Sequence, residues 1–253
     1  MKYILLLFLS IINLQISYSQ SMSISVNGVR FTMVYVKGGN FFMGSDDWDS
    51  FKDERPVHKV TLSPFLIGQT EVTQDLWRSV MGMNPSKREN ANNPVDCVSW
   101  NDCQVFIKKI SLLTGYNFRL PTEAEWEFAA RGGNYENKYS GSNVIGKVAF
   151  MGDNSASTAH SVAQREPNGY NLYDMTGNVW EWCSDWYAET YESNIEANDP
   201  IGPVNGIEHV IRGGSWNCMP RVCRVTNRYK CPPDGYRDDL GLRLVLDTNV
   251  IHK

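Results

Sequence analysis

Apolar side chains recur at helical spacing in three short stretches of the chain, and this pattern predicts three short helices. The first stretch follows Thr73, a residue type that caps helix N-termini, and ends before Gly82, which is typical of the position just past a helix. Val72 and Trp77 occupy the two positions of a hydrophobic staple across its start. We therefore expect a helix between Thr73 and Gly82.

The same signals predict the second and third helices. Ser99 is the expected cap of the second, whose apolar positions continue at helical spacing as far as Gly115. Thr122 opens a capping box with Glu125, and the third helix is expected to stop before Gly132.

Short runs at 34–36, 59–62 and 242–245 predict half-buried strands. Residues 130–170 are rich in Gly, Asn and Ser, so we expect irregular structure there. The chain shows no internal repeat, low-complexity linker or run of charge that would indicate a domain boundary. Strands near both ends with helices between them predict a single α+β domain.

Residues 1–19 have the pattern of a secretory signal peptide. Lys2 is followed by a short apolar run, and the segment ends in small residues at Ser17 and Ser19, where a signal peptidase would cut. The run is too short to span a membrane, and no cysteine follows the expected cut to carry a lipid anchor. The prediction is an exported protein that is periplasmic, held at the cell surface or secreted.

Charge and cysteine content narrow the function classes. The formal net charge of -4 includes no basic excess, which argues against nucleic acid or an anionic membrane as the main partner. All 6 cysteines follow the expected signal peptide, and export permits disulfides. The sequence does not assign their pairing, so free thiols and every pairing stay open at this point.

Two cysteines, Cys218 and Cys223, lie five positions apart and follow the turn-forming sequence Gly213-Gly214-Ser215. Thiolates this close together on a loop suit a soft metal ion such as Cu(I), or a redox reaction. Whether the pair forms a working site or part of a structural disulfide decides whether the protein is an enzyme.

An ordered series of short motifs extends over residues 29–246. Its most specific members are Phe42-Met43-Gly44, Val98-Ser99-Trp100-Asn101-Asp102, Arg119-Leu120-Pro121-Thr122-Glu123-Ala124-Glu125-Trp126-Glu127, Gly177-Asn178-Val179-Trp180-Glu181-Trp182, Arg212-Gly213-Gly214-Ser215 and Gly241-Leu242-Arg243. This series resembles the formylglycine-generating enzyme (sulfatase-modifying factor) family. The resemblance implies one α+β domain over 29–246, related to C-type lectins and poor in regular secondary structure.

Catalytic members of that family use oxygen and Cu(I), held by two cysteines, to oxidise a cysteine in a Cys-x-Pro-x-Arg segment of an unfolded sulfatase to formylglycine. Counted forward from the Gly-Gly-Ser turn, Cys218 and Cys223 fall on the copper ligands. The resemblance also implies that Ser215 lines the oxygen-side pocket and that Trp180 helps to shape it. The implied partner is a sulfatase-like protein or peptide substrate.

Counting backward from Arg228 and Pro233 implies a different assignment. The loop is then shorter than in copper-binding members, Cys223 takes the place of an aromatic residue, and the second ligand is missing. The chain also resembles exported relatives in which the positions of Cys183 and Cys223 carry cysteines, which implies a Cys183–Cys223 disulfide. The alternative function is therefore a non-catalytic exported binding module, with a cell-surface partner, on the same lectin-like fold.

The resemblance further implies a structural calcium site formed by Glu71, Asp174, Gly177, Val179 and Glu181. Calcium prefers several hard oxygen ligands, and three carboxylates with main-chain carbonyls of a Gly-Asn turn supply them. In the alternative interpretation, Asp174 stabilises the turn through its own backbone and Glu71 only lies at a helix entry.

Overall fold

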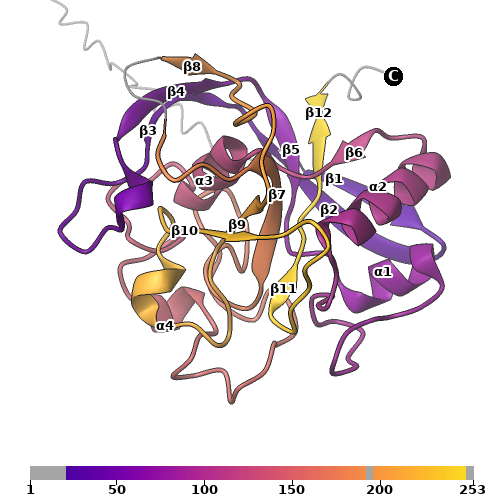
Figure 1. The fold of residues 1–253 in the computed structure, drawn as a ribbon. Helices are drawn as coiled ribbons and strands as arrows, with labels where there is room; N and C mark the ends of the chain where they lie inside the picture. The colour runs from indigo at the N-terminus through magenta and orange to yellow at the C-terminus, as the bar shows by residue number, and fades with distance from the viewer. Residues whose placement is uncertain (1–20, 192–195, 249–253) are drawn as a thin grey trace, which may run out of the picture.

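The computed structural model describes residues 21–191 and 196–248 (Figure 1). The predicted signal peptide at 1–19 lies outside the described residues. Within them, no helix has both the length and the apolar character that crossing a bilayer requires.

All three predicted helices are confirmed. They are α1 (Gln74–Met81), α2 (Trp100–Thr114) and α3 (Glu123–Arg131). The side chains of Thr73, Ser99 and Thr122 each accept a backbone N–H of the first turn, so the predicted caps form. Each helix ends at a glycine in the left-handed conformation, which costs other residues free energy: Gly82, Gly115 and Gly132.

Within the described residues the strands form three sheets. The five-stranded sheet has the order β1-β2-β5-β12-β6 and is antiparallel throughout. Its strands are β1 (Ser21–Val26), β2 (Val29–Val36), β5 (Phe65–Gly68), β12 (Val245–Asp247) and β6 (Phe118–Arg119). A three-stranded sheet pairs β3 (Gly39–Met43), β4 (His58–Leu62) and β8 (Ala197–Asn198).

The third sheet has the order β10-β9-β7-β11. It contains β10 (Arg228–Cys231), β9 (His209–Arg212), β7 (Trp180–Trp186) and β11 (Leu240–Gly241). Short helical turns complete the chain: η1 (Lys52–Glu54), α4 (Ile145–Val148) and η2 (Pro220–Cys223). Residues 130–170 contain α4 and are otherwise largely irregular, as predicted.

The predicted strand at 242–245 is wrong in position, because β12 begins only at Val245. Arg243 turns its fully buried side chain inward, where Nη1 and Nη2 donate to the carbonyl oxygens of Gly68 and Tyr173 at 2.9 Å. These contacts with distant parts of the chain hold Arg243 outside the regular strand, which begins only at Val245. The other two predicted strands are confirmed within β2 and β4.

Two large hydrophobic clusters lie between these elements. In the first, α1 and α2 pack together and against β1 and β2, and the ring of Trp77 stacks on Phe106 at 4.8 Å (Figure 1). In the second, α3 contacts β3, β4, β7 and β9, and Phe128 packs edge-on against Phe41. Helix α3 thus lies between the three-stranded and the four-stranded sheets.

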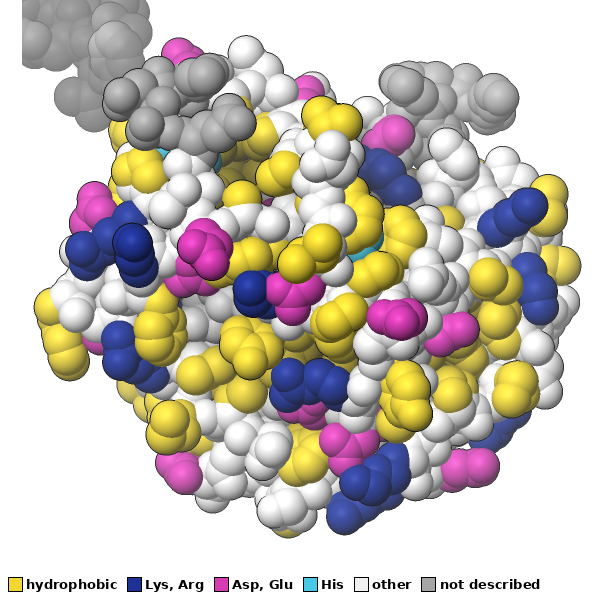
Figure 2. All heavy atoms as spheres, in the orientation of Figure 1, with side chains coloured by type: hydrophobic (Ala, Val, Ile, Leu, Met, Phe, Trp, Pro, Cys, Tyr) yellow, Lys and Arg dark blue, Asp and Glu magenta, His cyan; other side chains and the backbone are white. Residues whose placement is uncertain are grey.

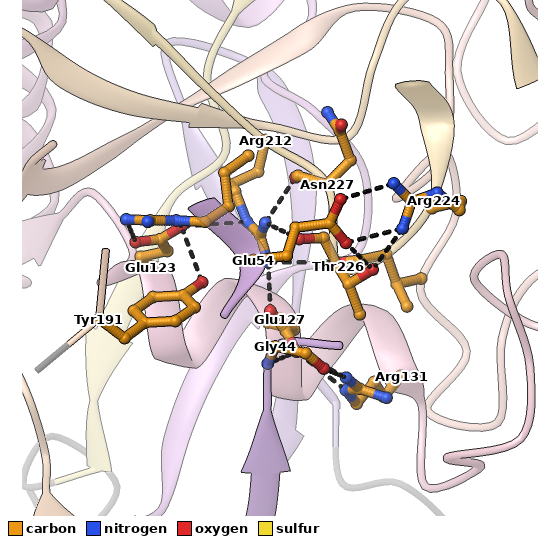
Figure 3. Close-up of polar contacts among 12 residues, drawn as sticks. Gly44, Glu54, Glu123, Glu127, Arg131, Tyr191, Arg212, Arg224, Thr226 and Asn227 are labelled. Carbon is orange, nitrogen blue, oxygen red and sulfur yellow. Dashed lines mark hydrogen bonds and ion pairs between the residues drawn. The ribbon is translucent and has the colours of Figure 1, made fainter. Parts of the chain in front are cut away.

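A network of buried ion pairs surrounds α3 (Figure 3). Glu127 is fully buried and accepts from Arg212, from Arg131 at 2.7 Å and from the backbone N–H of Gly44 at 3.0 Å. Its two oxygens therefore join α3 to β9 and to the end of β3.

The network extends through two further acidic side chains. Glu123 accepts from Nε and Nη2 of Arg228 at 2.6 and 2.8 Å. Glu54 accepts from both terminal nitrogens of Arg224 and from the hydroxyl of Thr226. Because these carboxylates are almost completely buried, each depends on its arginine partner for compensation.

Replacing Glu127 by Gln will strongly destabilise the fold, because the buried guanidinium of Arg212 loses its hydrogen-bonded counter-charge and keeps only the carboxylate of Glu123, 3.6 Å from Nε, which is already paired with Arg228. Breaking one side of such a pair costs about 3–5 kcal/mol. The matched control is Glu196→Gln, which removes an exposed carboxylate 2.7 Å from Lys59 and should change stability by about 1 kcal/mol at most. Urea unfolding of both variants tests this expectation, and equal losses would contradict it.

Candidate functional site

The turn after β9 brings the two predicted copper ligands together. Gly213 and Gly214 have positive φ angles of 99° and 75°. A Cβ atom on Gly214 would lie 2.6 Å from the sulfur of Cys223, so only glycine fits there. The turn therefore lets η2 fold back and place Cys223 against Ser215.

The side chains of Cys218 and Cys223 both contact Ser215, and each affects the ionisation of the other. The Cys223 thiol is the main reason that the pKa of Cys218 falls to about 7, against the opposing effect of burial. The neighbouring Cys218, followed by burial, raises the pKa of Cys223, whose thiol donates to the backbone carbonyl of Ser215 at 4.0 Å. Cys218 is thus the more acidic thiol of the pair.

Ser215 connects this pair to a charged residue. Its hydroxyl oxygen lies 3.3 Å from the Cys218 sulfur and donates to Oδ2 of Asp239 at 2.7 Å. Arg237 holds Asp239 in turn, with Nε and Nη2 donating at 2.8 and 3.0 Å. When Cys218 is protonated, the hydrogen bonds can run in one direction from Cys218 through Ser215 to Asp239.

Asp239 and Arg237 were not predicted as site residues. Asp239 lies 24 positions from Ser215, and no motif or spacing links the two residues. Their only sequence signal is that they directly precede the Gly241-Leu242-Arg243 motif.

Trp180 lies at the same site, at the start of β7. Its backbone N–H donates to the carbonyl of Asp239 at 2.8 Å, and its ring stacks on Tyr229 at 5.6 Å. Cys218 packs against the hydrophobic cluster that contains Trp180. The structure therefore brings together all four residues predicted for the catalytic site: Cys218, Cys223, Ser215 and Trp180.

The predicted Cys183–Cys223 disulfide is not formed. All six cysteines lie among the described residues, and all six are free. Cys183 is buried on β7 beside Asp185, Glu123 and Arg212, whereas Cys223 faces Cys218.

The carboxylates of the predicted calcium site lie near one another, although the described residues contain no group of three acidic, histidine or cysteine side chains arranged to hold a metal ion. Glu71, Asp174 and Glu181 interact electrostatically with one another, and Arg243 is the basic group that faces them. Burial, followed by the charge of Asp174, raises the pKa of Glu71 well above its usual range. Burial likewise raises the pKa of Asp174 to about 6. Three acidic groups thus share one guanidinium in a region closed to water.

The oxygens of this cluster differ in how far they are satisfied. Glu71 Oε1 is buried and has no hydrogen-bond partner, whereas Oε2 accepts weakly from the amide of Asn178 at 3.4 Å. Glu181 is occupied, because its oxygens accept from Arg243 at 2.6 Å and from the indole of Trp126 at 2.7 Å. Val179 lies next to Glu71, with its backbone N–H directed at that carboxyl group.

The remaining predicted ligand, Gly177, forms the turn next to this cluster. Its φ is +77°, and a Cβ atom there would lie 2.2 Å from the carbonyl oxygen of Phe150. Glu71 and Asp174 are thus the two carboxyls of the predicted set that Arg243 does not bind, while Glu181 is held by Arg243.

The sequence profile of the sulfatase-modifying factor enzyme 1-like domain matches residues 29–248, and the chain belongs to this family. The formylglycine-generating enzyme of Streptomyces coelicolor is 31% identical, over 86% of this chain and 90% of the relative. Among solved structures, Treponema denticola variable protein 1 has a TM-score of 0.84 at 34% identity and covers 90% of this chain and 99% of its own. PvdO from Pseudomonas aeruginosa has a TM-score of 0.75 at 26% identity, over 85% of this chain and 94% of its own.

These findings confirm the predicted family and fold class. The domain is a single α+β domain of the type found in formylglycine-generating enzymes and C-type lectins. Charged side chains of both signs are interspersed with apolar ones on the face shown in Figure 2, in keeping with the absence of a basic excess in the sequence.

Cys218 should be the cysteine that reacts fastest with iodoacetamide near neutral pH, because its pKa of about 7 leaves a large thiolate fraction. Cys97 is the internal control, since it is also half-buried, but burial and the neighbouring Asp96 raise its pKa to about 12. Peptide mass spectrometry after a short labelling pulse should show at least about 100-fold faster alkylation of Cys218. Similar rates at the two cysteines would contradict the lowered pKa of Cys218.

Proposed function

We propose that this protein is a copper-dependent oxidase that converts a cysteine of a protein substrate to formylglycine. The convergence of the Cys218 and Cys223 thiols on Ser215, at 3.3 Å from its hydroxyl and 4.0 Å from its carbonyl oxygen, is the observation that carries this proposal. Two adjacent thiols, one of them with a lowered pKa, are a donor set that suits Cu(I). The formylglycine-generating relatives, which match over most of their length, support a protein substrate.

Each residue of the site has a distinct task in this proposal. Cys218 and Cys223 would hold the metal as thiolates, and bound Cu(I) would supply the one-electron chemistry with oxygen that side chains lack. Asp239 accepts a hydrogen bond from the hydroxyl of Ser215, so a lone pair of the Ser215 oxygen stays directed at the cysteines. Arg237 fixes the position of the Asp239 carboxylate through two hydrogen bonds. Trp180 closes one side with apolar surface.

An anaerobic Cu(I) titration in the presence of a competing chelator tests this function. The wild-type protein should bind one equivalent of Cu(I). Removing a residue that only supports a metal ligand lowers metal affinity by ~10–100-fold, and Cys218→Ser and Cys223→Ser should each lower the Cu(I) affinity by more than this. Cys231→Ser is the matched control, because Cys231 is a buried free thiol that does not contact the pair.

Activity provides the second readout of the same experiment. The wild type and Cys231→Ser should oxidise a Cys-x-Pro-x-Arg peptide, and the two site variants should not. Full oxidase activity in Cys223→Ser would rule out the proposed role of that residue.

A non-catalytic binding module is the second candidate function. It is favoured by the complete burial of Cys223 and by the similarity to a protein named as a variable protein and not as an enzyme. In this case the wild-type protein, with its thiols free, would neither bind Cu(I) tightly nor oxidise the peptide. The protein would then act through a cell-surface partner, and the proposed export signal at 1–19 would bring it there.

We also propose that Glu71 and Asp174 bind a structural calcium ion. The unpartnered, buried Oε1 of Glu71 supports this site, as does the excess of acidic groups over the single guanidinium of Arg243. A divalent cation would balance that excess and supply the missing partner. Main-chain carbonyls of the turn at Gly177 would complete the ligand set.

Calcium should raise the melting temperature of the wild-type protein, by about 5–10 °C at 100 times the dissociation constant. Glu71→Gln should abolish this shift, whereas Glu89→Gln, which changes an exposed carboxylate, should retain it. An equal calcium response in both variants would exclude the site.

The calcium response should also depend on pH. The pKa of Asp174 is about 6 in the folded protein and therefore higher than in the unfolded chain. Protonation of Asp174 thus stabilises the metal-free fold at low pH, and this contribution to stability is lost as the pH rises through about 6. Calcium must displace these protons, so its stabilising effect should weaken as the pH falls below about 6.

A further inference from the structure

A second site is suggested by a cavity of about 260 Å³ between β7, α3 and the loop at 200–203. Its walls are largely apolar and include Met43, Ala124, Trp186, Ile201 and Pro203. None of its lining residues belongs to the cysteine site or to the carboxylate cluster around Glu71. The volume lies just below the range of drug-sized ligand sites, so the cavity suits a small molecule or a single side chain.

Asp185, on β7, is the polar group that this cavity leaves unsatisfied. The residue is only 5% exposed. Its Oδ2 accepts from the backbone N–H of Glu123 at 2.9 Å and from the hydroxyl of Ser184 at 3.0 Å. Within residues 21–191 and 196–248, no donor reaches Oδ1. Oδ1 is not among the fully enclosed unpartnered atoms of the described residues, so it stays accessible from the cavity and can accept a hydrogen bond from a ligand donor there.

The loop at 200–203 closely covers this carboxylate. A Cβ atom on Gly202 would lie 2.9 Å from the Cβ of Asp185 and 3.0 Å from Oδ1. Gly202 also has a φ of +72°, so both space and conformation require glycine here. The backbone thus approaches Asp185 and narrows the space beside Oδ1.

The other charged groups of the cavity are already paired. Glu123 is held by Arg228 at 2.6 and 2.8 Å, and the remaining Arg228 nitrogen, Nη1, donates to the carbonyls of Asp53 and Ala188. His58, which also lines the cavity, is hydrogen-bonded through Nδ1 to the carbonyl of Pro56 at 3.0 Å. Among the described residues, Asp185 therefore forms no ion pair, whereas Glu123 beside it has two arginine partners. Burial, followed by the nearby charge of Glu123, raises the pKa of Asp185 to about 7, which is the direction expected for an uncompensated carboxylate.

We propose that this cavity binds a primary ammonium group on a short apolar stem, with the ammonium donating to Oδ1 of Asp185. The ammonium supplies both the missing donor and the missing positive charge, while the stem lies against Trp186, Ile201 and Met43. A neutral donor would supply only the first of these, and an anion would be repelled by Asp185 and Glu123. The site is independent of copper and calcium binding.

Isothermal titration calorimetry with n-hexylammonium as the probe tests this inference. At about pH 8 the amine is protonated and Asp185 is largely ionised. The probe should bind with one-to-one stoichiometry. 1-Hexanol has the same stem but no charge, so it lacks the charge-assisted hydrogen bond and its affinity should be lower by about tenfold or more. Hexanoate should not bind. Equal binding of the amine and the alcohol, or no binding of the amine, would overturn the proposal.

Two variants locate the binding site. Asp185→Asn keeps the shape but removes the charge, and should weaken hexylammonium binding by about tenfold. Ala197→Leu enlarges a half-buried side chain of the wall and should exclude the stem without changing any charge. Asp234→Asn, at an exposed carboxylate away from the cavity, is the matched control and should bind as the wild type does. Unchanged affinity in Asp185→Asn would refute the role of Asp185.

Discussion

The ion pair between Glu127 and Arg212 determines where the cysteine site lies. Arg212 is the last residue of β9 and immediately precedes the Gly213-Gly214-Ser215 turn, so its position sets the start of that turn. Both side chains are fully buried, which means that neither can find a substitute partner in water. Helix α3 thereby fixes the strand end from which the loop with Cys218 and Cys223 departs.

The neighbouring residue of α3 has the same effect on the acidic cluster. The indole N–H of Trp126 donates to Glu181, which also accepts from Arg243. Adjacent residues of one helix turn thus anchor β9 and β7, and through them both candidate metal sites. Glu71 and Asp174 have no such direct partner in Arg243, and they are the two carboxyls of the cluster whose pKa values burial raises.

Local signals in the sequence were sufficient for the helices and for part of the cysteine site. Thr73, Ser99 and Thr122 cap helices through contacts that lie within one turn, so a single sequence contains the information. The spacing of Cys218 and Cys223 likewise lies within one loop. Asp239 could not be found in this way, because its contact with Ser215 depends on how β7, β9 and β11 assemble.

The error at 242–245 has the same origin. The local pattern of apolar residues there is that of a strand, but Arg243 bonds to Glu181, Gly68 and Tyr173, each of which is distant in sequence. Tertiary hydrogen bonds to one side chain override the local preference of its neighbours. For the same reason the unpaired oxygens of Glu71 and Asp185 become visible only in three dimensions.

Buried arginines allow a domain with so much irregular backbone to exclude water. Loop carbonyls in the interior lack the partners that a helix or a sheet would give them, and each requires a donor. Arg212 donates to the carbonyls of Thr226 and Asn227, and Arg228 donates to those of Asp53 and Ala188. The guanidinium group has five donors in a planar fork, so one side chain can satisfy loop carbonyls and a carboxylate together. Lysine has a single side-chain nitrogen and could not make both sets of contacts. Each buried arginine needs an acidic partner, so the buried carboxylates follow from the irregular loops of this fold as well as from its function.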